Sequence, residues 1–163
     1  MSVKKIFPLD PYNEDHLKII KEIINNSKFE AYYCNTLLEN RNSFTKEEYL
    51  ENKKLSNELE DILIVEEDSK IKGYCHIKGE KDLKMCQLSF PVKDNKLRNI
   101  VALFTEYAQN QLNFEEVFIR LDNSDKSHDK MLRDLGFESL GEELGKSIYL
   151  KEKEHEQDIQ RKI

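Results

Sequence analysis

Three side chains that can move or orient protons lie in two consecutive stretches predicted to form a β-hairpin. Tyr74 and His76 alternate along the first stretch, and Gln87 falls on the same face of the second. Histidine changes its charge near neutral pH, so His76 is the candidate general base, with Tyr74 and Gln87 as alternatives. A surface histidine on a strand is also common without a catalytic role, and that interpretation stays open.

Three cations occur within six residues where a predicted strand runs into a predicted helix. Lys93, Lys96 and Arg98 lie in the stretch FPVKDNKLRNIV, residues 90–101. The first turn of a helix presents unpaired backbone N–H groups, and nearby cations suit a phosphate there. The stretch contains no glycine, and Asp94 is placed to cap the helix with its own carboxylate. The alternative is that these cations are solvated on an exposed turn.

The composition is that of a globular protein that can bury a core. The 163 residues are 38% hydrophobic and 36% charged, which suits one domain. We expect that domain over residues 1–151 and a charged tail over residues 152–163. The net charge of −6 argues against a nucleic-acid partner, because nucleic-acid binding uses a basic face.

The sequence shows no targeting or metal-binding pattern. No apolar run approaches the roughly 20 residues of a membrane span, and none follows the N-terminal lysines. We therefore expect a cytoplasmic protein with no membrane partner. Cys34, Cys75 and Cys86 form no CxxC pair, so no metal site is predicted, and we interpret them as buried reduced thiols.

Hydrophobic periodicity predicts an α/β (α+β) fold with a mixed, mostly antiparallel sheet of about seven strands and about four helices. The expected order is strand, two helices, three strands, helix, strand, helix, two strands. The second helix is expected over residues 43–60, with Ser43 or Thr45 as its cap. A turn at Gly79–Asp82 places Cys75 opposite Cys86 in the hairpin.

The most regular helical pattern lies in the middle of the chain. Apolar side chains recur at helical spacing from Leu97 to Leu112, and a β-like stretch lies on each side. A strand, a long helix and another strand predict a parallel crossover.

This order of elements resembles the GCN5-related N-acetyltransferase superfamily. The stretch ILIVEEDSKIKGYCHIK, residues 62–78, is similar to that family's second and third strands. The stretch VFIRLDNSDKSHDKMLRDLGFESLGE, residues 117–142, is similar to its fifth strand, fourth helix and sixth strand. The resemblance covers roughly residues 4–151 and implies transfer of an acyl group, most often acetyl, from CoA to an amine.

The resemblance also implies where acetyl-CoA and the acceptor bind. The pantetheine arm is expected in a gap between the fourth and fifth strands, and the pyrophosphate at the start of the following helix. Tyr32 and Tyr33 are expected to line the acceptor side. The implied coenzyme-binding residues are Leu88, Ser89, Phe90, Lys93, Lys96, Leu97, Arg98, Asn99, Ile100, Val101, Asn123 and Ser127.

The sequence departs from the family pattern at two functional positions. The phosphate-binding stretch lacks the family's spaced glycines, and Leu132 stands where the family often has a tyrosine that protonates the leaving thiolate. We therefore predict an acyl-CoA-dependent N-acyltransferase that acts on an amine of a small molecule or protein. The alternative is an inactive binding or regulatory module with the same fold, and a homodimer is possible in either case.

Overall fold

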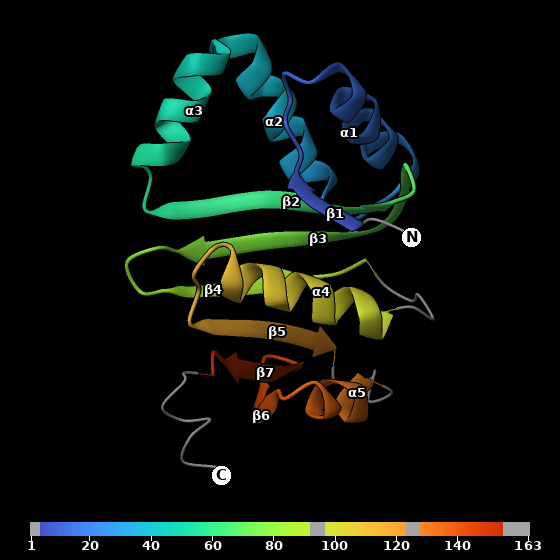
Figure 1. Ribbon diagram of the computed structural model, residues 1–163, viewed down its shortest axis with the longest axis vertical. Coiled ribbons are helices and arrows are strands. Elements are labelled where there is room, and N and C mark those ends of the chain that lie inside the picture. Colours follow the sequence, from blue (N-terminus) through green and yellow to red (C-terminus); the bar gives the residue numbers. More distant parts are fainter. Residues whose placement is uncertain (1–3, 92–96, 123–127, 155–163) are drawn as a thin grey trace. The chain divides into compact units, whose positions relative to one another are not determined.

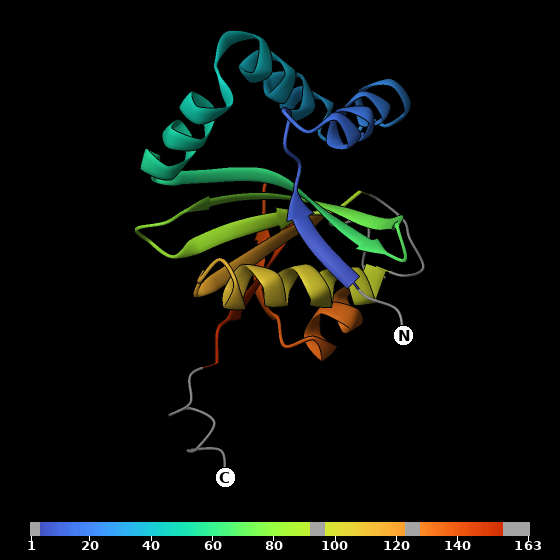
Figure 2. The same cartoon turned by 45° about the horizontal axis from the view of Figure 1, so that its top comes forward.

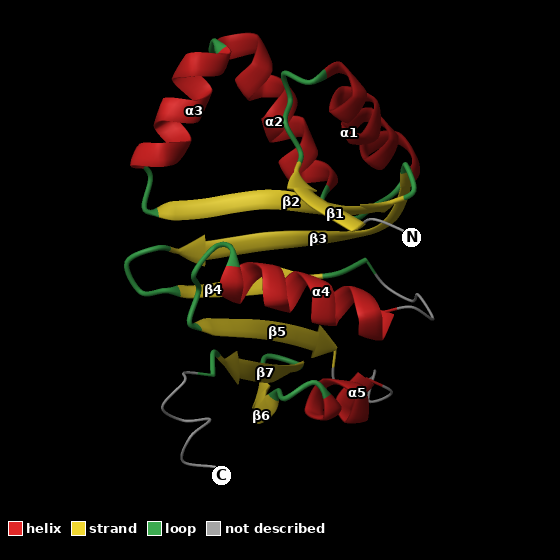
Figure 3. Cartoon of the chain, in the orientation of Figure 1, coloured by secondary structure: helices red, strands yellow, loops and turns green. Residues whose placement is uncertain are grey.

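The structure is a computed structural model that describes residues 4–91, 97–122 and 128–154. It divides into two compact units, the first made of Met1–Ile77 with Phe90–Val92 and the second of Lys78–Ser89 with Lys93–Ile163. Figure 1 shows the elements in sequence colours, and Figure 3 separates helices from strands. No helix among the described residues is long and apolar enough to span a membrane.

The strands form a mixed seven-stranded sheet in the order β1-β2-β3-β4-β5-β7-β6, which confirms the predicted fold class. Strand β5 pairs in parallel with β4 and antiparallel with β7, and the helix α4 connects β4 to β5 as the crossover pattern predicted. The strands are β1 (Lys4–Pro8), β2 (Glu58–Glu67), β3 (Lys70–Glu80), β4 (Met85–Ser89), β5 (Glu116–Asp122), β6 (Glu138–Glu143) and β7 (Lys146–Glu152).

The first unit packs three helices against β1 and β2 (Figure 2). Its helices are α1 (Glu14–Asn26), α2 (Ala31–Ser43) and α3 (Lys46–Leu55). Alternate residues of β2, among them Ile62 and Ile64, face the helices because side chains on a strand alternate between its two sides. The buried cluster consists of Leu9, Ile20, Ile23, Tyr33, Cys34, Leu37, Tyr49, Ile62 and Ile64.

The structure has one more helix before β2 than the sequence predicted. Helix α2 runs through the polar stretch at residues 40–43, and the break follows at Phe44. Thr45 then caps α3, in a capping box with Glu48. The prediction that this helix extends to residue 60 is wrong. Helix α3 ends at Leu55, and β2 already begins at Glu58, before its apolar run.

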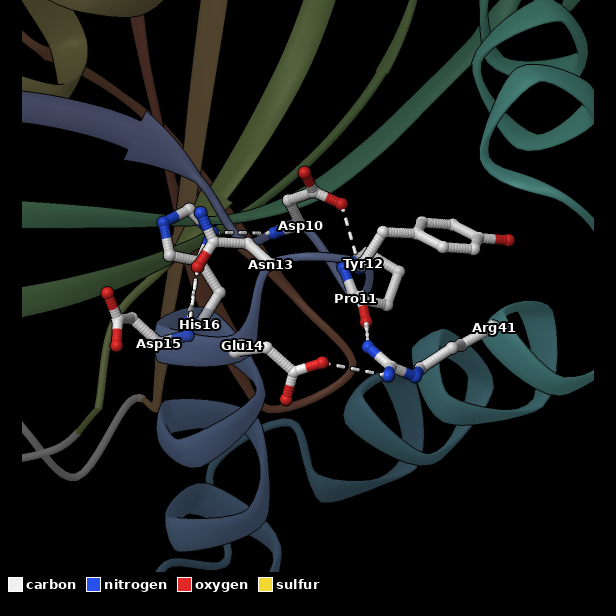
Figure 4. Close-up of polar contacts among 8 residues, drawn as sticks. All are labelled: Asp10, Pro11, Tyr12, Asn13, Glu14, Asp15, His16 and Arg41. Carbon is white, nitrogen blue, oxygen red and sulfur yellow. Dashed lines mark hydrogen bonds and ion pairs between the residues drawn. The ribbon is translucent and has the colours of Figure 1, made fainter.

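The loop from β1 into α1 is held by side chains at both of its ends (Figure 4). The Asn13 side chain accepts hydrogen bonds from the backbone N–H groups of Asp15 and His16, which caps α1. Arg41 donates from α2 to the Pro11 carbonyl at 2.7 Å and to the Glu14 carboxylate at 3.1 Å. These contacts fix where α1 starts relative to α2.

The second unit contains α4 (Leu97–Asn110) and α5 (Asp129–Asp134), and Figure 1 shows α4 alongside β5. The apolar stripe predicted for α4 is buried, as Ile100, Phe104 and Ala108 show. Thr105 and Gln109 are buried on the same helix although they are polar. All three cysteines of the chain are buried, as predicted, and none of them forms a disulfide.

The hairpin between β3 and β4 has a different register from the one predicted. Strand β3 continues to Glu80, and the turn occupies Lys81–Lys84. A Cβ atom placed on Gly79 would lie 2.9 Å from the Cβ of Cys86, so Gly79 rather than Cys75 lies beside Cys86. The predicted pairing of Cys75 with Cys86 is therefore wrong, because the chain turns two residues later than Gly79–Asp82 suggested.

We expect Gly79→Ala to lower the free energy of unfolding by about 1–3 kcal/mol, because the new methyl group overpacks a filled site. It would lie 2.8 Å from two ring carbons of Phe114. Urea denaturation measures the loss, and Lys78→Ala, at an exposed position of the same strand, is the control with a change under about 0.5 kcal/mol. Adding Phe114→Leu should recover part of the loss, and an unchanged deficit would contradict the steric explanation.

Candidate active site

His76 on β3 is held between two carboxylates within the first unit. Its Nε2 lies 2.7 Å from Oε2 of Glu60 on β2, and its Nδ1 lies 3.6 Å from Oε2 of Glu30. The His76 side chain is 12% exposed, and those of Glu60 and Glu30 are 36% and 31% exposed. A carboxylate bonded to one ring nitrogen fixes the orientation of an imidazole, as in a catalytic triad. His76 therefore has the surroundings of a general base.

Glu30 reaches this cluster from an unusual backbone conformation. It precedes α2 with φ 47° and ψ 32°, in the left-handed region that non-glycine residues seldom adopt. Strained backbone of this kind is found preferentially at functional sites, where the surrounding structure maintains it. Here the conformation accompanies the contact between the Glu30 carboxylate and His76.

Sequence reasoning identified His76 but missed both carboxylates. Glu60 lies in a segment that was predicted to be helical. The strand pattern that places Glu60 on the same side of β2 as Ile62 and Ile64 was therefore not recognised. Glu30 lies between two helices and comes to His76 only through the tertiary fold. The β-type alternation of ELEDILIVEE was the available signal for Glu60.

The two adjacent tyrosines predicted for the acceptor side have different surroundings. Tyr33 is buried, its hydroxyl donates to the backbone oxygen of Glu60 at 2.7 Å, and its ring centroid lies 5.6 Å from that of His76. Burial raises the pKa of Tyr33, so this hydroxyl stays protonated and acts as a donor. Tyr32 is 87% exposed. Within the first unit, the fold brings Tyr33 but not Tyr32 to His76.

The other two candidates for the base are less well placed. Tyr74 packs partly against the apolar cluster of the first unit, with its ring 6.5 Å from that of Phe29. Burial raises the pKa of Tyr74, which makes it a poor base at neutral pH. Gln87 belongs to the second unit, where it is half-buried and lies opposite Phe118 in the β4–β5 pair. His76 remains the best candidate of the three.

A buried ion pair lies beside this cluster. Asp61 on β2 is 6% exposed and is paired with the ammonium group of Lys53 on α3. Burial raises the pKa of Asp61, and Lys53 opposes that shift. This pair fastens α3 to the end of β2 from which Glu60 projects, so it supports the candidate site structurally.

In the second unit, the pairing of β4 with β5 stops before β5 ends. The parallel register runs from Met85–Glu116 to Leu88–Ile119. Arg120, Leu121 and Asp122 continue β5 and pair with β7 on the other side. Among the described residues, the parallel β4–β5 register ends at Leu88–Ile119, three residues before β5 ends.

Helix α4 begins at Leu97, so residues 97–101 of the predicted pyrophosphate stretch form the first turn of a helix. Leu97, Ile100 and Val101 turn their side chains into the core, while Arg98 and Asn99 are exposed. The first backbone N–H groups of a helix have no partner within it, so they suit an anion. Arg98 adds a charge there, in a loose pair with Asp134 at 3.8 Å.

The remaining predicted coenzyme residues are placed as follows. Leu88 is buried, and Ser89 and Phe90 are half-buried. Lys93, Lys96, Asn123 and Ser127 lie outside the described residues, as does Asp94, so their predicted roles stay predictions.

Leu132 is buried in the core of the second unit and offers no proton donor, as the sequence suggested. A tyrosine that sequence reasoning missed lies nearby in the fold. Tyr149 on β7 lies opposite Ile119, and its hydroxyl donates to Oδ1 of Asp129, the first residue of α5, at 2.6 Å. Burial and this hydrogen bond raise the pKa of Tyr149 to about 12, so it remains protonated. Its proton is directed to Asp129.

Comparison with solved structures supports one fold. The chain resembles the N-acetyltransferase PseH of Campylobacter jejuni in complex with acetyl coenzyme A, with a TM-score of 0.64, 11% identity, and coverage of 93% of this chain and 100% of that one. It resembles a chimera of the spermidine N-acetyltransferase SpeG of Vibrio cholerae and hSSAT, with a TM-score of 0.60, 12% identity, and coverage of 91% and 95%.

A third similar structure is the PaiA N-acetyltransferase of Thermoplasma acidophilum in complex with coenzyme A, with a TM-score of 0.53, 15% identity, and coverage of 93% and 99%. No protein-family model and no curated protein sequence matches the chain. The chain has the fold of these N-acetyltransferases, which confirms at the level of fold the resemblance to the GCN5-related superfamily.

We expect Tyr33→Phe to lower the free energy of unfolding by about 1–2 kcal/mol, because it leaves the Glu60 carbonyl without its donor. Tyr32→Phe is the matched control, since the adjacent tyrosine is 87% exposed, and it should change stability by less than about 0.5 kcal/mol. Thermal and urea denaturation measure both variants. If both substitutions change stability equally, the Tyr33 hydroxyl does not stabilise the fold through its hydrogen bond to the Glu60 carbonyl.

Proposed function

We propose that the chain is an acyl-CoA-dependent N-acyltransferase, with acetyl-CoA as donor and an amine as acceptor. The observation that carries the proposal is that β4–β5 pairing ends at Leu88–Ile119 while β5 continues to Asp122. An extended amide-containing chain could pair with the backbone of β5 beyond Ile119, as another strand would. Pantetheine is such a chain.

The start of α4 fits the charged part of the coenzyme. The first N–H groups of a helix have no partner within the helix and lie at the positive end of its dipole, and Arg98 supplies a full charge there. These donors belong to the backbone, so they are present without the glycines that the family uses there. The side chains of Leu97, Ile100 and Val101 are buried and do not cover them.

The His76 cluster fits the acceptor chemistry. When bound, acyl-CoA supplies an activated acyl group as a thioester, and the amine forms a C–N bond as the C–S bond breaks. His76 accepts the proton that the attacking ammonium loses, directly or through a water molecule. Glu60 orients the imidazole and stabilises the positive charge that it gains. A good leaving group such as a thiolate can take its proton from water, so the leucine at position 132 does not prevent the reaction.

The same cluster favours a cationic acceptor. Glu30 and Glu60 place two carboxylates around His76, and the whole chain has a net charge of −6. An ammonium group approaching this site is attracted before it loses its proton. We therefore assign the acceptor to the class of primary amines, on a small molecule or a protein, and place the reaction in the cytoplasm.

Acetyl-CoA should raise the melting temperature of the protein, because a ligand that binds only the folded state stabilises it by mass action. We expect a shift of several degrees at 1 mM acetyl-CoA, which is about 100 times a Kd near 10 µM. Ser89→Trp, at the point where β4 leaves β5, should abolish the shift, and Ser139→Trp on β6 should not. An unshifted wild-type melting curve at millimolar acetyl-CoA would favour the inactive binding module.

His76→Gln should lower kcat by about 100-fold or more, and leave the acetyl-CoA shift unchanged, since general-base catalysis contributes factors of this size. Release of CoA thiol, followed with a panel of primary amines that includes polyamines and amino sugars, measures the rate. His16→Asn is the control: the His16 Nδ1 accepts from the Asp10 backbone N–H, and the asparagine side-chain oxygen can take the place of that nitrogen. If the His76→Gln variant keeps its activity, a residue other than His76 is the general base.

A further inference from the structure

Glu30 occupies a position where the local fold does not favour glutamate. Its backbone, with φ 47° and ψ 32°, is in the left-handed region that glycine and asparagine adopt more readily. It also stands at the N-cap of α2, where a short polar side chain would bind the first N–H groups, yet its own side chain makes no capping hydrogen bond. The carboxylate lies near His76 instead. Helix α2 alone therefore gives no reason for a carboxylate at this position.

The bond between Glu60 and His76 determines which ring nitrogen of His76 can accept a proton. An ionised carboxylate only accepts hydrogen bonds, so the 2.7 Å contact of Glu60 Oε2 with Nε2 places a hydrogen on Nε2. In the neutral imidazole the free lone pair then lies on Nδ1. Nδ1 is therefore the atom that can take a proton from the acceptor amine.

Nδ1 and the Glu30 carboxylate can share one donor. Glu30 Oε2 lies 3.6 Å from Nδ1, which is beyond hydrogen-bond distance, so two acceptors face each other when His76 is neutral. A group with at least two N–H bonds can satisfy both, and a primary ammonium has three. The Glu30 side chain is 31% exposed, so its carboxylate is open to such a ligand.

Aromatic side chains of the first unit lie beside these polar groups. Phe29 directly precedes Glu30, and Tyr74 is on the same side of β3 as His76 because the two residues alternate along the strand. The Phe29 and Tyr74 rings are 6.5 Å apart, and both residues are only half-buried. Next to the ammonium position the site therefore offers ring surface that suits an apolar chain.

We propose that Glu30 is the specificity-determining residue of the acceptor site and that it selects primary alkylamines in their ammonium form. The ammonium group donates to Glu30 and to Nδ1 of His76, and the alkyl chain lies against Phe29 and Tyr74. One ammonium proton passes to Nδ1, and the lone pair that this frees forms the C–N bond as the C–S bond of the thioester breaks. The use made of the bound amine rests on the proposed acyltransferase function, whereas amine binding is measured without the coenzyme.

The test is an NMR titration of the full-length protein with n-hexylamine hydrochloride at pH 7 and constant ionic strength. It follows the ring signals of the four histidines, and the signal that His76→Gln removes belongs to His76. We expect a saturable shift of the His76 signal, with a Kd on the order of 1 mM. Hexan-1-ol, which has no charge, and aniline, which is uncharged at pH 7, should bind at least tenfold more weakly.

Glu30→Gln tests the charge with a side chain of the same shape. It should raise both the Kd and the KM for hexylamine at least tenfold, while kcat stays within threefold of wild type and the acetyl-CoA melting shift is unchanged. Glu51→Gln, which removes the same charge from an exposed position on α3, is the matched control that should keep wild-type affinity. Glu30→Asp, which keeps the charge on a shorter side chain, should recover part of the lost affinity.

Glu30→Gly separates amine binding from folding. Glycine adopts the left-handed conformation without strain, so this variant should melt at the wild-type temperature or above it. It should nevertheless lose hexylamine affinity at least as far as Glu30→Gln does. A carboxylate that only stabilised the fold would instead give a lower melting temperature in both variants.

The proposal is overturned if hexylamine leaves the His76 signal unshifted, if hexan-1-ol binds equally well, or if Glu30→Gln binds hexylamine like wild type. Failure of the proposed acyltransferase function is a different result. Acetyl-CoA would then leave the melting curve of the wild type unshifted, while the hexylamine titration would still show whether Glu30 selects an ammonium group.

Discussion

The parallel pairing of β4 with β5 is the constraint on which the second unit depends. Two parallel strands cannot be joined by a tight turn, because the chain must return to the edge from which it left. Here α4 makes that return, so its first turn follows the end of β4 and its last turn precedes β5. The end of the β4–β5 register and the start of α4 are thus brought about by one topological requirement.

The central crossover could be predicted from the sequence because its signal is local, whereas the hairpin before it depends on residues far apart in the sequence. The stripe from Leu97 to Ala108 is a local signal, because each buried position lies three or four residues from the next. The turn between β3 and β4 is decided by what Gly79 contacts, namely Phe114 and Cys86. Phe114 is 35 residues away in sequence, so the glycine that suggested a turn instead marks a close approach inside the strand.

The candidate site was also predicted only in part: the histidine was identified, and the two carboxylates beside it were not. His76 could be identified from its residue type and its alternation on β3, which are local properties. The two carboxylates near its ring come from the connection between α1 and α2, at Glu30, and from a neighbouring strand, at Glu60. Helical composition around residue 60 hid the strand that presents Glu60, because lysine, leucine and glutamate favour helix locally and tertiary packing overrides them.

Helix α4 also carries the clearest disagreement between local pattern and burial. Thr105 and Gln109 lie on its buried side among residues such as Phe104 and Ala108, where an apolar side chain would satisfy packing at no polar cost. Gln109 is accounted for by its bond to the Lys151 carbonyl, which fastens the helix to β7. Thr105 is buried, and its hydroxyl makes no hydrogen bond among the described residues. Consistency between sequence and structure fails mainly at functional positions.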